Sequence, residues 1–348
     1  MADTRHESDV RYDTDERAAE RHHEQHGKSE RDLPGADAER PRDMGWSAWK
    51  QVLTRVKDEI REDNVALLAG GVALFALLAV PPAIVAAVTL WGLFAEPSQI
   101  TQAISSVSEI LPGGATTFLE DQITSVAEGS DSTLGWGLAI GLVAAIWSAS
   151  SGMKGIMNAL TGAYDETEGR GFLKLRGMAL ALTFGGMIFA LLTIGLIAVL
   201  PVVLEQIAVI SWIETVFLWG RWPALALAMV LGLAALYHYG PDRSRAKWRW
   251  VTPGAIAGTL IWLAASAGFA WYASAFDKFS STYGTMAGLV IFILWLFLTA
   301  FSILIGAEIN AELEHQTAAD STVDGPSPMG QRGAYVADTR PEQDSDER

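Results

Sequence analysis

Long apolar runs without a polar face dominate the middle of this 348-residue chain. Six of them can be delimited, at residues 65–94, 134–162, 177–204, 221–240, 252–275 and 284–307. A helix rises about 1.5 Å per residue, so about 20 residues cross the hydrocarbon core of a bilayer, which is about 30 Å thick. The pattern therefore predicts an all-α fold, a polytopic transmembrane helical bundle of about six spans within residues 46–315.

The segment before the first run repeats in a different way. Apolar side chains recur at helical spacing in residues 46–63, and basic side chains lie between them. The apolar positions are Trp46, Trp49, Val52, Leu53, Val56 and Ile60, and the basic ones are Lys50, Arg55, Lys57 and Arg61. This pattern predicts an amphipathic helix at the membrane interface, with its tryptophans at headgroup level. A helix packed on the body of the protein is the alternative.

A polar segment follows the first apolar run. Residues 98–128 are too polar to span a membrane, and Pro112-Gly113-Gly114 divides them into two stretches. Each stretch has one apolar face, so we expect two short amphipathic helices on the outer surface. These helices either cap a cavity from outside or rest on the lipid headgroups.

Both ends of the chain are polar. Residues 1–45 and 316–348 hold 20 acidic and 11 basic side chains, in a chain of net charge −15. They have too few apolar residues to compensate for the entropy of ordering, so we predict two disordered tails. The first of them also lacks the short apolar run of a cleavable signal peptide. Nucleic acid is not an expected partner, because binding to it depends on neutralising phosphates with basic residues.

The charges between the spans predict an orientation. Basic residues gather in two connections, 163–176 and 241–251, whereas residues 95–133 contain six acidic residues and no Lys or Arg. By the positive-inside rule, both basic connections and both termini are expected on the cytoplasmic side. An even number of spans, such as six, places the two termini on one side.

Prolines and glycines mark special positions inside the spans. Pro81 and Pro82 remove backbone donors from the first span, so we predict a helix break or kink there. Transporters use such breaks to build binding sites, and a kink without a transport role is the alternative. Small residues four apart, such as Gly254 and Gly258, predict close packing of neighbouring helices.

Four stretches of the chain carry a family resemblance. They read DNVALLAGGVALFALLAVPP at 63–82, WSASSGMKGIMNALTGAYDETEGRGFLKLRG at 147–177, YHYGPDRSRAKWRWVTPGAIAGTLIW at 237–262 and YGTMAGLVIFILWLFLTAFSILIGAEINAELE at 283–314. In this order they resemble the YihY family of bacterial inner-membrane proteins. This family is also called the virulence factor BrkB family and was formerly labelled ribonuclease BN-like.

The resemblance implies a six-helix protein of the bacterial inner membrane. Some family members are linked to envelope lipid export or to ion and solute transport. The chain departs from the family pattern after Gly71, where an aromatic pair is common, and at Lys154, where arginine is expected. Neither departure affects the expected fold.

Few ionisable residues lie inside the predicted spans, where such residues are costly and often functional. Lys154 and Asn158 share one face of the second span, and Arg170 and Arg176 follow it. These four residues are the candidate site for an anionic group, such as a lipid phosphate. The alternative is that Lys154 extends to the interface as part of the positive-inside pattern.

Glu308 and Asn310 close the sixth span and are candidates for a structural or a coupling charge. We expect Glu308 to pair with a loop arginine such as Arg243 or Arg245. Proton coupling through Glu308 is the alternative.

No catalytic constellation, cofactor or metal site is expected. The chain has no cysteine. His22, His23 and His26 have a spacing that metal sites use, but they lie in a polar tail without supporting residues. A nuclease needs clusters of His and Asp, and the predicted membrane body contains only His238 and His315.

The leading hypothesis is a transporter or flippase-like protein for a lipid or an anionic solute, with the lipid bilayer as its surroundings. A non-transporting envelope scaffold, or a membrane protein that binds a partner, is the alternative. An enzyme is not expected, ribonuclease included, and the sequence leaves homo-oligomer formation open.

Overall fold

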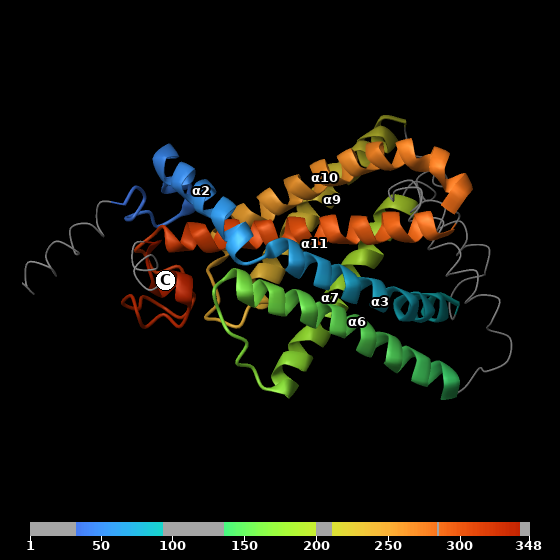
Figure 1. Ribbon diagram of the computed structural model, residues 1–348, viewed down its shortest axis with the longest axis horizontal. Helices are drawn as coiled ribbons and strands as arrows, with labels where there is room; N and C mark the ends of the chain where they lie inside the picture. The colour runs from blue at the N-terminus through green and yellow to red at the C-terminus, as the bar shows by residue number, and fades with distance from the viewer. Residues whose placement is uncertain (1–32, 93–135, 200–210, 284, 342–348) are drawn as a thin grey trace, which may run out of the picture.

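A computed structural model describes residues 33–92, 136–199, 211–283 and 285–341 (Figure 1). The longer elements are α-helices, and the only pairing of extended backbone in these ranges is an isolated bridge between Ala246 and Thr322. The elements are η1 (Pro41–Asp43), α2 (Trp46–Glu62), α3 (Val65–Gly92), α6 (Trp136–Ala163), α7 (Phe172–Ile194), η3 (Gly195–Val199), α9 (Ser211–Tyr239), α10 (Trp248–Tyr283), α11 (Thr285–His315) and α12 (Tyr335–Asp338).

Four helices in the described residues are long and apolar enough to cross a membrane. They are Phe172–Ile197, Val216–Tyr239, Trp248–Tyr272 and Gly288–His315. Only 6% of the most apolar window of each of the first two is buried inside the molecule. Such an apolar surface would be costly in water, so these helices fit a lipid environment.

The prediction of an all-helical, polytopic bundle is therefore confirmed, and the number of six spans stays a prediction. The bent pair α2 and α3 would add a fifth span if it crossed as one. The helices α3 and α6 are each 28 residues long, which is enough to cross by length. The predicted outer segment 98–128 lies outside the described residues.

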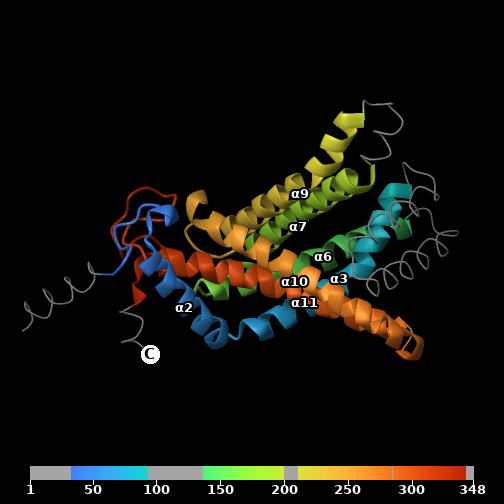
Figure 2. The same ribbon diagram turned by 90° about the horizontal axis from the view of Figure 1, so that it is seen from above.

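The centre of the bundle is the pair α10 and α11, which run side by side along the molecule (Figures 1 and 2). A Cβ atom on Gly306 would lie 2.6 Å from the Gly254 carbonyl oxygen, and one on Gly258 would lie 3.2 Å from the Ser302 carbonyl oxygen. The two backbones thus touch where small residues face each other. The close packing predicted from Gly254 and Gly258 is confirmed.

The prediction of a helix break at Pro81 and Pro82 is wrong, since α3 continues from Val65 to Gly92, and the kink that was its alternative stays a prediction. Pro82 has no N–H for the carbonyl of Leu78, one turn earlier. The Ser148 hydroxyl of α6 donates a hydrogen bond to that carbonyl at 3.4 Å. A neighbouring helix therefore supplies the donor that the proline removes.

The bend in this part of the chain lies earlier, between α2 and α3. The two helices meet at 63°. Asn64 lies between them and has a φ of 51°, in the left-handed region that ends helices. This bend separates the direction of α2 from that of the apolar helix that follows it.

The termini differ from the prediction of disordered tails. Residues 33–45 and 316–341, here called the cap, are folded together against the end of α11. The Ala318 N–H donates to the Ala36 carbonyl at 2.8 Å, and the Thr317 hydroxyl donates to the Ala38 carbonyl at 2.6 Å. Polar side chains thus satisfy buried backbone groups, so a polar composition did not prevent folding here. Residues 1–32 and 342–348 lie outside the described residues.

The two basic connections, 163–176 and 241–251, lie at the same end as the cap. The Tyr335 N–H donates to Glu166 Oε1 at 2.7 Å, and the Ser244 N–H donates to the Gly333 carbonyl at 2.8 Å. Figure 1 shows α2 and the C-terminal segment at this end of the molecule. The described residues nearest the two termini thus lie with the two basic connections, and we call this the terminal end of the bundle. The cytoplasmic placement of both termini stays a prediction.

Candidate functional site

The last two turns of α11 carry a buried polar cluster at the terminal end. Glu308, Asn310, Glu312 and Glu314 are each at most 4% exposed. Carboxylates are rarely buried to this extent unless they are paired. The partners of each one therefore decide what this cluster can do.

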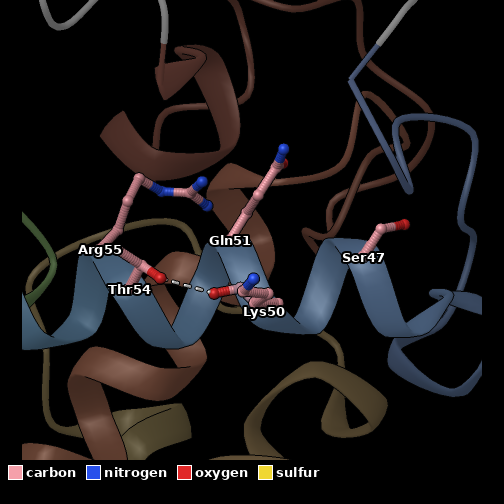
Figure 3. A pocket seen from close by; sticks show the side chains of 5 residues that line it. All are labelled: Ser47, Lys50, Gln51, Thr54 and Arg55. Carbon is pink, nitrogen blue, oxygen red and sulfur yellow. Dashed lines mark hydrogen bonds between the residues drawn. The ribbon is translucent and has the colours of Figure 1, made fainter.

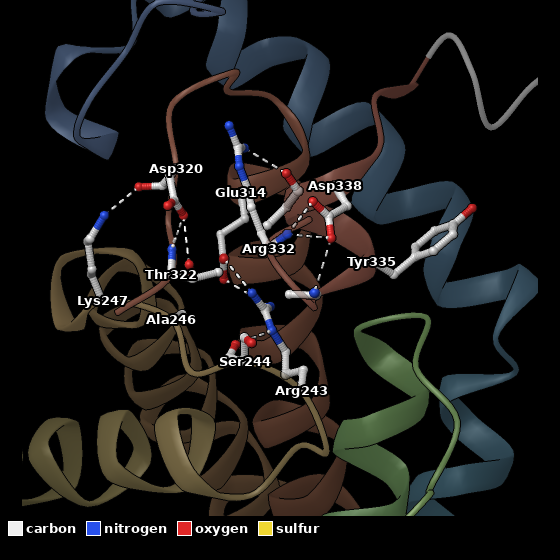
Figure 4. Close-up of polar contacts among 12 residues, drawn as sticks. Arg243, Ser244, Ala246, Lys247, Glu314, Asp320, Thr322, Arg332, Tyr335 and Asp338 are labelled. Carbon is white, nitrogen blue, oxygen red and sulfur yellow. Dashed lines mark hydrogen bonds and ion pairs between the residues drawn. The ribbon is translucent and has the colours of Figure 1, made fainter. Parts of the chain in front are cut away.

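Glu314 is paired with Arg243 from the loop before α10. Arg243 donates to both carboxylate oxygens, at 3.2 and 2.7 Å, and the two side chains are 3% and 0% exposed (Figure 4). The guanidinium also lies 4.8 Å above the ring of Tyr164. Burial is the largest single influence on the pKa of Arg243 and lowers it. The charge of Glu314, its hydrogen bonds with Arg243, and the charges of Tyr164 and Glu166 together raise it by more, so the pKa of Arg243 is raised and the pair stays ionised.

Glu312 is paired with Arg55 of α2. The Arg55 Nε donates to Glu312 Oε2, and its Nη2 donates to Gln316 Oε1 at 2.6 Å. His315 Nδ1 lies 3.7 Å from the other oxygen of Glu312. This contact fixes the amphipathic helix α2 against α11.

Asn310 joins α11 to the first turns of α10. Its side-chain oxygen accepts a hydrogen bond from the Gly254 N–H at 2.7 Å, and its nitrogen donates to the Val251 carbonyl at 3.0 Å. Asn310 therefore has a structural role, which was one of its two predicted roles.

Glu308 is 2% exposed, and its Oε1 has no hydrogen-bond partner among the described residues. The expected pairing of Glu308 with Arg243 is wrong, because Arg243 binds Glu314. Arg245 lies 5.8 Å above the ring of Tyr239 instead. Sequence spacing could not separate Glu308 from Glu314, since both lie on the same helix end.

Arg170 and Arg176, two members of the predicted anion site, are bound to the protein itself. Arg170 donates to Glu168 at 2.6 and 2.8 Å and lies 3.5 Å from Asp242. The hydrogen bond from Arg170 lowers the pKa of Glu168. A ligand at Arg170 would therefore compete with two carboxylates.

Arg176 is 8% exposed and lies between α6 and α7. Its guanidinium stacks 3.6 Å from the ring centroid of Trp147, and it donates to the Trp147 carbonyl at 2.8 Å and to the Ser151 hydroxyl at 3.1 Å. Sequence reasoning missed Trp147 as a partner. The signal for it is that Trp147 and Ser151 are one turn apart on α6.

Lys154 differs from these arginines. It is partly buried in α6, nine residues before the helix ends at Ala163, and has no hydrogen bond or ion pair within the described part of the chain. Its charge is close enough to Glu168 to lower the pKa of that carboxyl group. Asn158, one turn along α6, is exposed. Of the three predicted cations, Lys154 is the one without a hydrogen bond or ion pair in the described residues.

The loops at the terminal end are held by the cap (Figure 4). Asp338 accepts hydrogen bonds from the N–H groups of Gly330, Arg332 and Gly333 at 2.7 to 2.9 Å. The Lys247 ammonium donates to the Asp320 carbonyl at 2.6 Å. The part of the cap after α11 therefore holds the two basic connections in place.

Glu166, which accepts a hydrogen bond from the Tyr335 N–H of the cap, allows the contact between the cap and the connection 163–176 to be tested. Burial raises the pKa of Glu166, and it outweighs the hydrogen bond from Tyr335 and the charge of Arg243, which lower it. Between the ordinary pKa of a glutamate and the raised pKa of Glu166, the folded protein keeps a proton that the unfolded chain has lost. The free energy of unfolding therefore falls as the pH rises through this range. We expect Glu166→Gln to be more stable than wild type at about pH 7, by less than about 1 kcal/mol because the group is only half-buried.

At about pH 4 the two proteins should unfold at similar temperatures, because Glu166 is then protonated in both states. Glu168→Gln is the control with the opposite sign, since its pKa is lowered by Arg170 and its stabilisation is present at neutral pH and lost on acidification. Thermal unfolding of both variants at the two pH values measures this difference. Equal changes of the same sign in the unfolding temperatures of the two variants would contradict the opposite pKa shifts of Glu166 and Glu168.

A surface pocket of about 450 Å³ lies on α2 at the terminal end (Figure 3). It is open to the surroundings and is lined by Ser47, Lys50, Gln51, Thr54 and Arg55. Hydroxyl, amide and cationic groups line this pocket, and because Arg55 is paired with Glu312, an anion in it would meet Lys50.

No group of three or more His, Asp or Glu side chains in the described ranges is placed to hold a metal ion. His22, His23 and His26 lie outside those ranges.

Comparison with known proteins gives one family. The model of the virulence factor BrkB family matches residues 56–329. The ribonuclease-like protein YfkH of Bacillus subtilis (strain 168) is 31% identical over 249 residues, which cover 69% of this chain and 87% of YfkH. The UPF0761 membrane protein Nmul_A0452 of Nitrosospira multiformis is 36% identical over 83 residues, or 24% of this chain and 19% of that protein.

A UPF0761 membrane protein of Tolumonas auensis is 33% identical over 82 residues, which cover 24% of this chain and 27% of that protein. The likeness to the two UPF0761 proteins is therefore confined to about a quarter of the chain. No solved structure matches the chain.

Proposed function

Since this chain belongs to the virulence factor BrkB family of membrane proteins, we propose that it is a transporter or flippase-like protein for a lipid or an anionic solute. Lys154 is the cation that meets the substrate. The observation that carries this proposal is the state of Lys154, which is partly buried in a long apolar helix and has no hydrogen bond or ion pair in the described residues. A cation in such a position is commonly part of a pathway.

The position of Lys154 supports a binding site below the surface. Nine residues of helix separate it from Ala163, which corresponds to about 14 Å along α6. Glu168, which the charge of Lys154 influences, is itself held by Arg170. Lys154 is thus available to a ligand anion, whereas the two predicted arginines serve to position the α6–α7 hairpin.

The terminal end is proposed to face the cytoplasm of a bacterium. The two basic connections, 163–176 and 241–251, lie at that end. Connections rich in Lys and Arg stay on the cytoplasmic side during insertion. In this orientation Lys154 is reached from the cytoplasmic leaflet.

The full chain in liposomes tests this proposal with two probes, fluorescent phosphatidylglycerol and radiolabelled inorganic phosphate. We expect faster transfer of one probe than in protein-free liposomes, and a loss of at least about tenfold in Lys154→Met, because a hydrogen bond to a charged group contributes about 1.5–3 kcal/mol. Lys174→Met is the matched control, since Lys174 is exposed in the same hairpin. Unchanged transfer in Lys154→Met, or no transfer of either probe, would overturn the proposal.

A non-transporting scaffold is the second candidate. The observation that favours it is one continuous cluster of buried apolar side chains that joins α2, α3, α6, α9, α10 and α11. The two candidates differ in the liposome assay, where a scaffold transfers neither probe. The ribonuclease-like name belongs to the relative YfkH, and we propose that this chain is not an enzyme. RNA cleavage by the purified wild-type protein would contradict that.

A further inference from the structure

The helix α2 is fixed to the bundle by one face. Ala48, Val52 and Val56 are buried, at 0%, 0% and 5% exposure, in the apolar cluster that includes α11. Arg55 adds the ion pair to Glu312. The orientation of α2 is therefore set, and its opposite face points away from the bundle.

That opposite face has an ordered composition. Positions 46, 50, 53, 57 and 61 are spaced by four, three, four and four residues, so their side chains share one side of the helix. Trp46 is 78% exposed and Leu53 is 47% exposed. Lys50, Lys57 and Arg61 complete the set and are exposed as well. We call these five residues the outer stripe.

No acidic residue of α2 lies on the outer stripe, and Glu59, one of the three, is partly buried. Asp58 and Glu62 are exposed and four residues apart, so they form a separate row next to the stripe. The exposed basic residues of α2 thus lie on the outer stripe, and its exposed acidic residues lie beside the stripe. Such a distribution of charge is typical of a helix that binds an anionic membrane surface, and it is not required of a helix whose exposed face meets only water.

The pocket on α2 extends the outer stripe on the side of Ser47 and Thr54 (Figure 3). Lys50 belongs to both the pocket and the stripe. The Thr54 hydroxyl donates to the Lys50 carbonyl at 2.9 Å, which leaves the Ser47 hydroxyl and the Lys50 ammonium as donors on this side of the pocket. A phosphate placed there meets a cation and a hydroxyl at the edge of two exposed apolar side chains.

We propose that the outer stripe of α2 binds anionic phospholipids in the leaflet at the terminal end. Trp46 and Leu53 enter the headgroup region, and Lys50, Lys57 and Arg61 contact phosphate groups. The 63° bend between α2 and α3 lets α2 follow the membrane surface while α3 enters the bilayer. This binding is independent of the proposed transport, because Lys154 lies on α6.

Native mass spectrometry of the full chain in mild detergent tests the lipid class. Phosphatidylglycerol should be retained more than phosphatidylcholine by wild type. In the triple variant Lys50→Gln, Lys57→Gln, Arg61→Gln we expect about a 100-fold loss of phosphatidylglycerol affinity, since each basic residue near an anionic surface contributes about fivefold. The matched control removes three exposed basic residues elsewhere, by Arg40→Gln, Arg42→Gln and Lys174→Gln. Equal losses in both variants, or none, would overturn the proposal.

Because the chain has no cysteine, single labels can report the depth of α2. A nitroxide at Leu53→Cys, in nanodiscs with phosphatidylglycerol, should be shielded from a water-soluble relaxant. A nitroxide at Asp58→Cys, on the acidic row, should remain accessible. Equal accessibility at the two positions would contradict the proposal, and so would spin–spin broadening at position 53, which would assign the stripe to a second copy of the chain.

Discussion

Gly254→Ala is expected to destabilise the protein by about 3 kcal/mol or more. A Cβ atom at this position would overlap the Gly306 carbonyl oxygen and lie 2.5 Å from the side-chain carbon of Asn310. Backbone atoms cannot move aside as a side chain can, so α10 and α11 would have to separate. Their separation would also break the hydrogen bonds of Asn310 to Gly254 and Val251.

Thermal unfolding in detergent, followed by tryptophan fluorescence, measures this effect. Gly268→Ala is the control in the same helix, because a Cβ atom there has nothing within 4 Å. Alanine favours a helix over glycine by about 1 kcal/mol, so Gly268→Ala should be neutral or stabilising. Comparable losses in the two variants would show that the close approach of α10 and α11 is not what Gly254 provides.

Glu314→Gln is expected to cost about 3–5 kcal/mol, because it leaves the Arg243 guanidinium buried without its counter-charge. The two side chains are 0% and 3% exposed, so water cannot replace the lost partner. Arg243→Met should have an effect of similar size, since it leaves the Glu314 carboxylate unpaired.

The double variant Arg243→Met, Glu314→Gln decides between charge and packing. We expect it to be more stable than the sum of the single changes predicts, by more than about 2 kcal/mol, because it contains no unpaired charge. Additive losses in this double-mutant cycle would mean that the pair contributes through packing of the loop before α10 rather than through its charges.

Much of the bundle could be predicted from the sequence. Apolar runs gave the long helices because lipid-facing helices need no polar side, and spacing gave the glycine contact of α10 with α11. The residues at which helices begin and end were predicted less accurately. The fourth predicted span begins at 221, but α9 begins at Ser211 with Pro223 inside it, because one proline does not end a helix that neighbouring helices support.

The cap could not be predicted, and the reason is chemical. Its buried residues include Thr317, Ser321, Arg332 and Arg340, which composition assigns to a disordered tail. The Arg332 guanidinium donates to the carbonyls of Ala337 and Ala318 at 2.7 Å each. The cap also depends on contacts between residues far apart in sequence, such as Ala318 with Ala36, and single-sequence patterns carry no record of them.

The candidate anion site stays a prediction. Spacing brought Lys154 and Asn158 onto α6, and the positive-inside pattern pointed to the arginines. The sequence pattern could not show that Arg170 is bound by Glu168 and Arg176 by Trp147, because a count of charges does not show which cations have partners.

The cap also sets the timing of assembly. Ala38 and Thr317, which it joins, are 279 positions apart. At a synthesis rate of about 5–20 residues per second, the ribosome reaches Thr317 roughly 15 to 60 seconds after Ala38. Residues 33–45 therefore cannot form their contacts in the cap until residues 316–341 have been synthesised. If translation stops before residue 317, the truncated protein lacks the residues against which 33–45 fold.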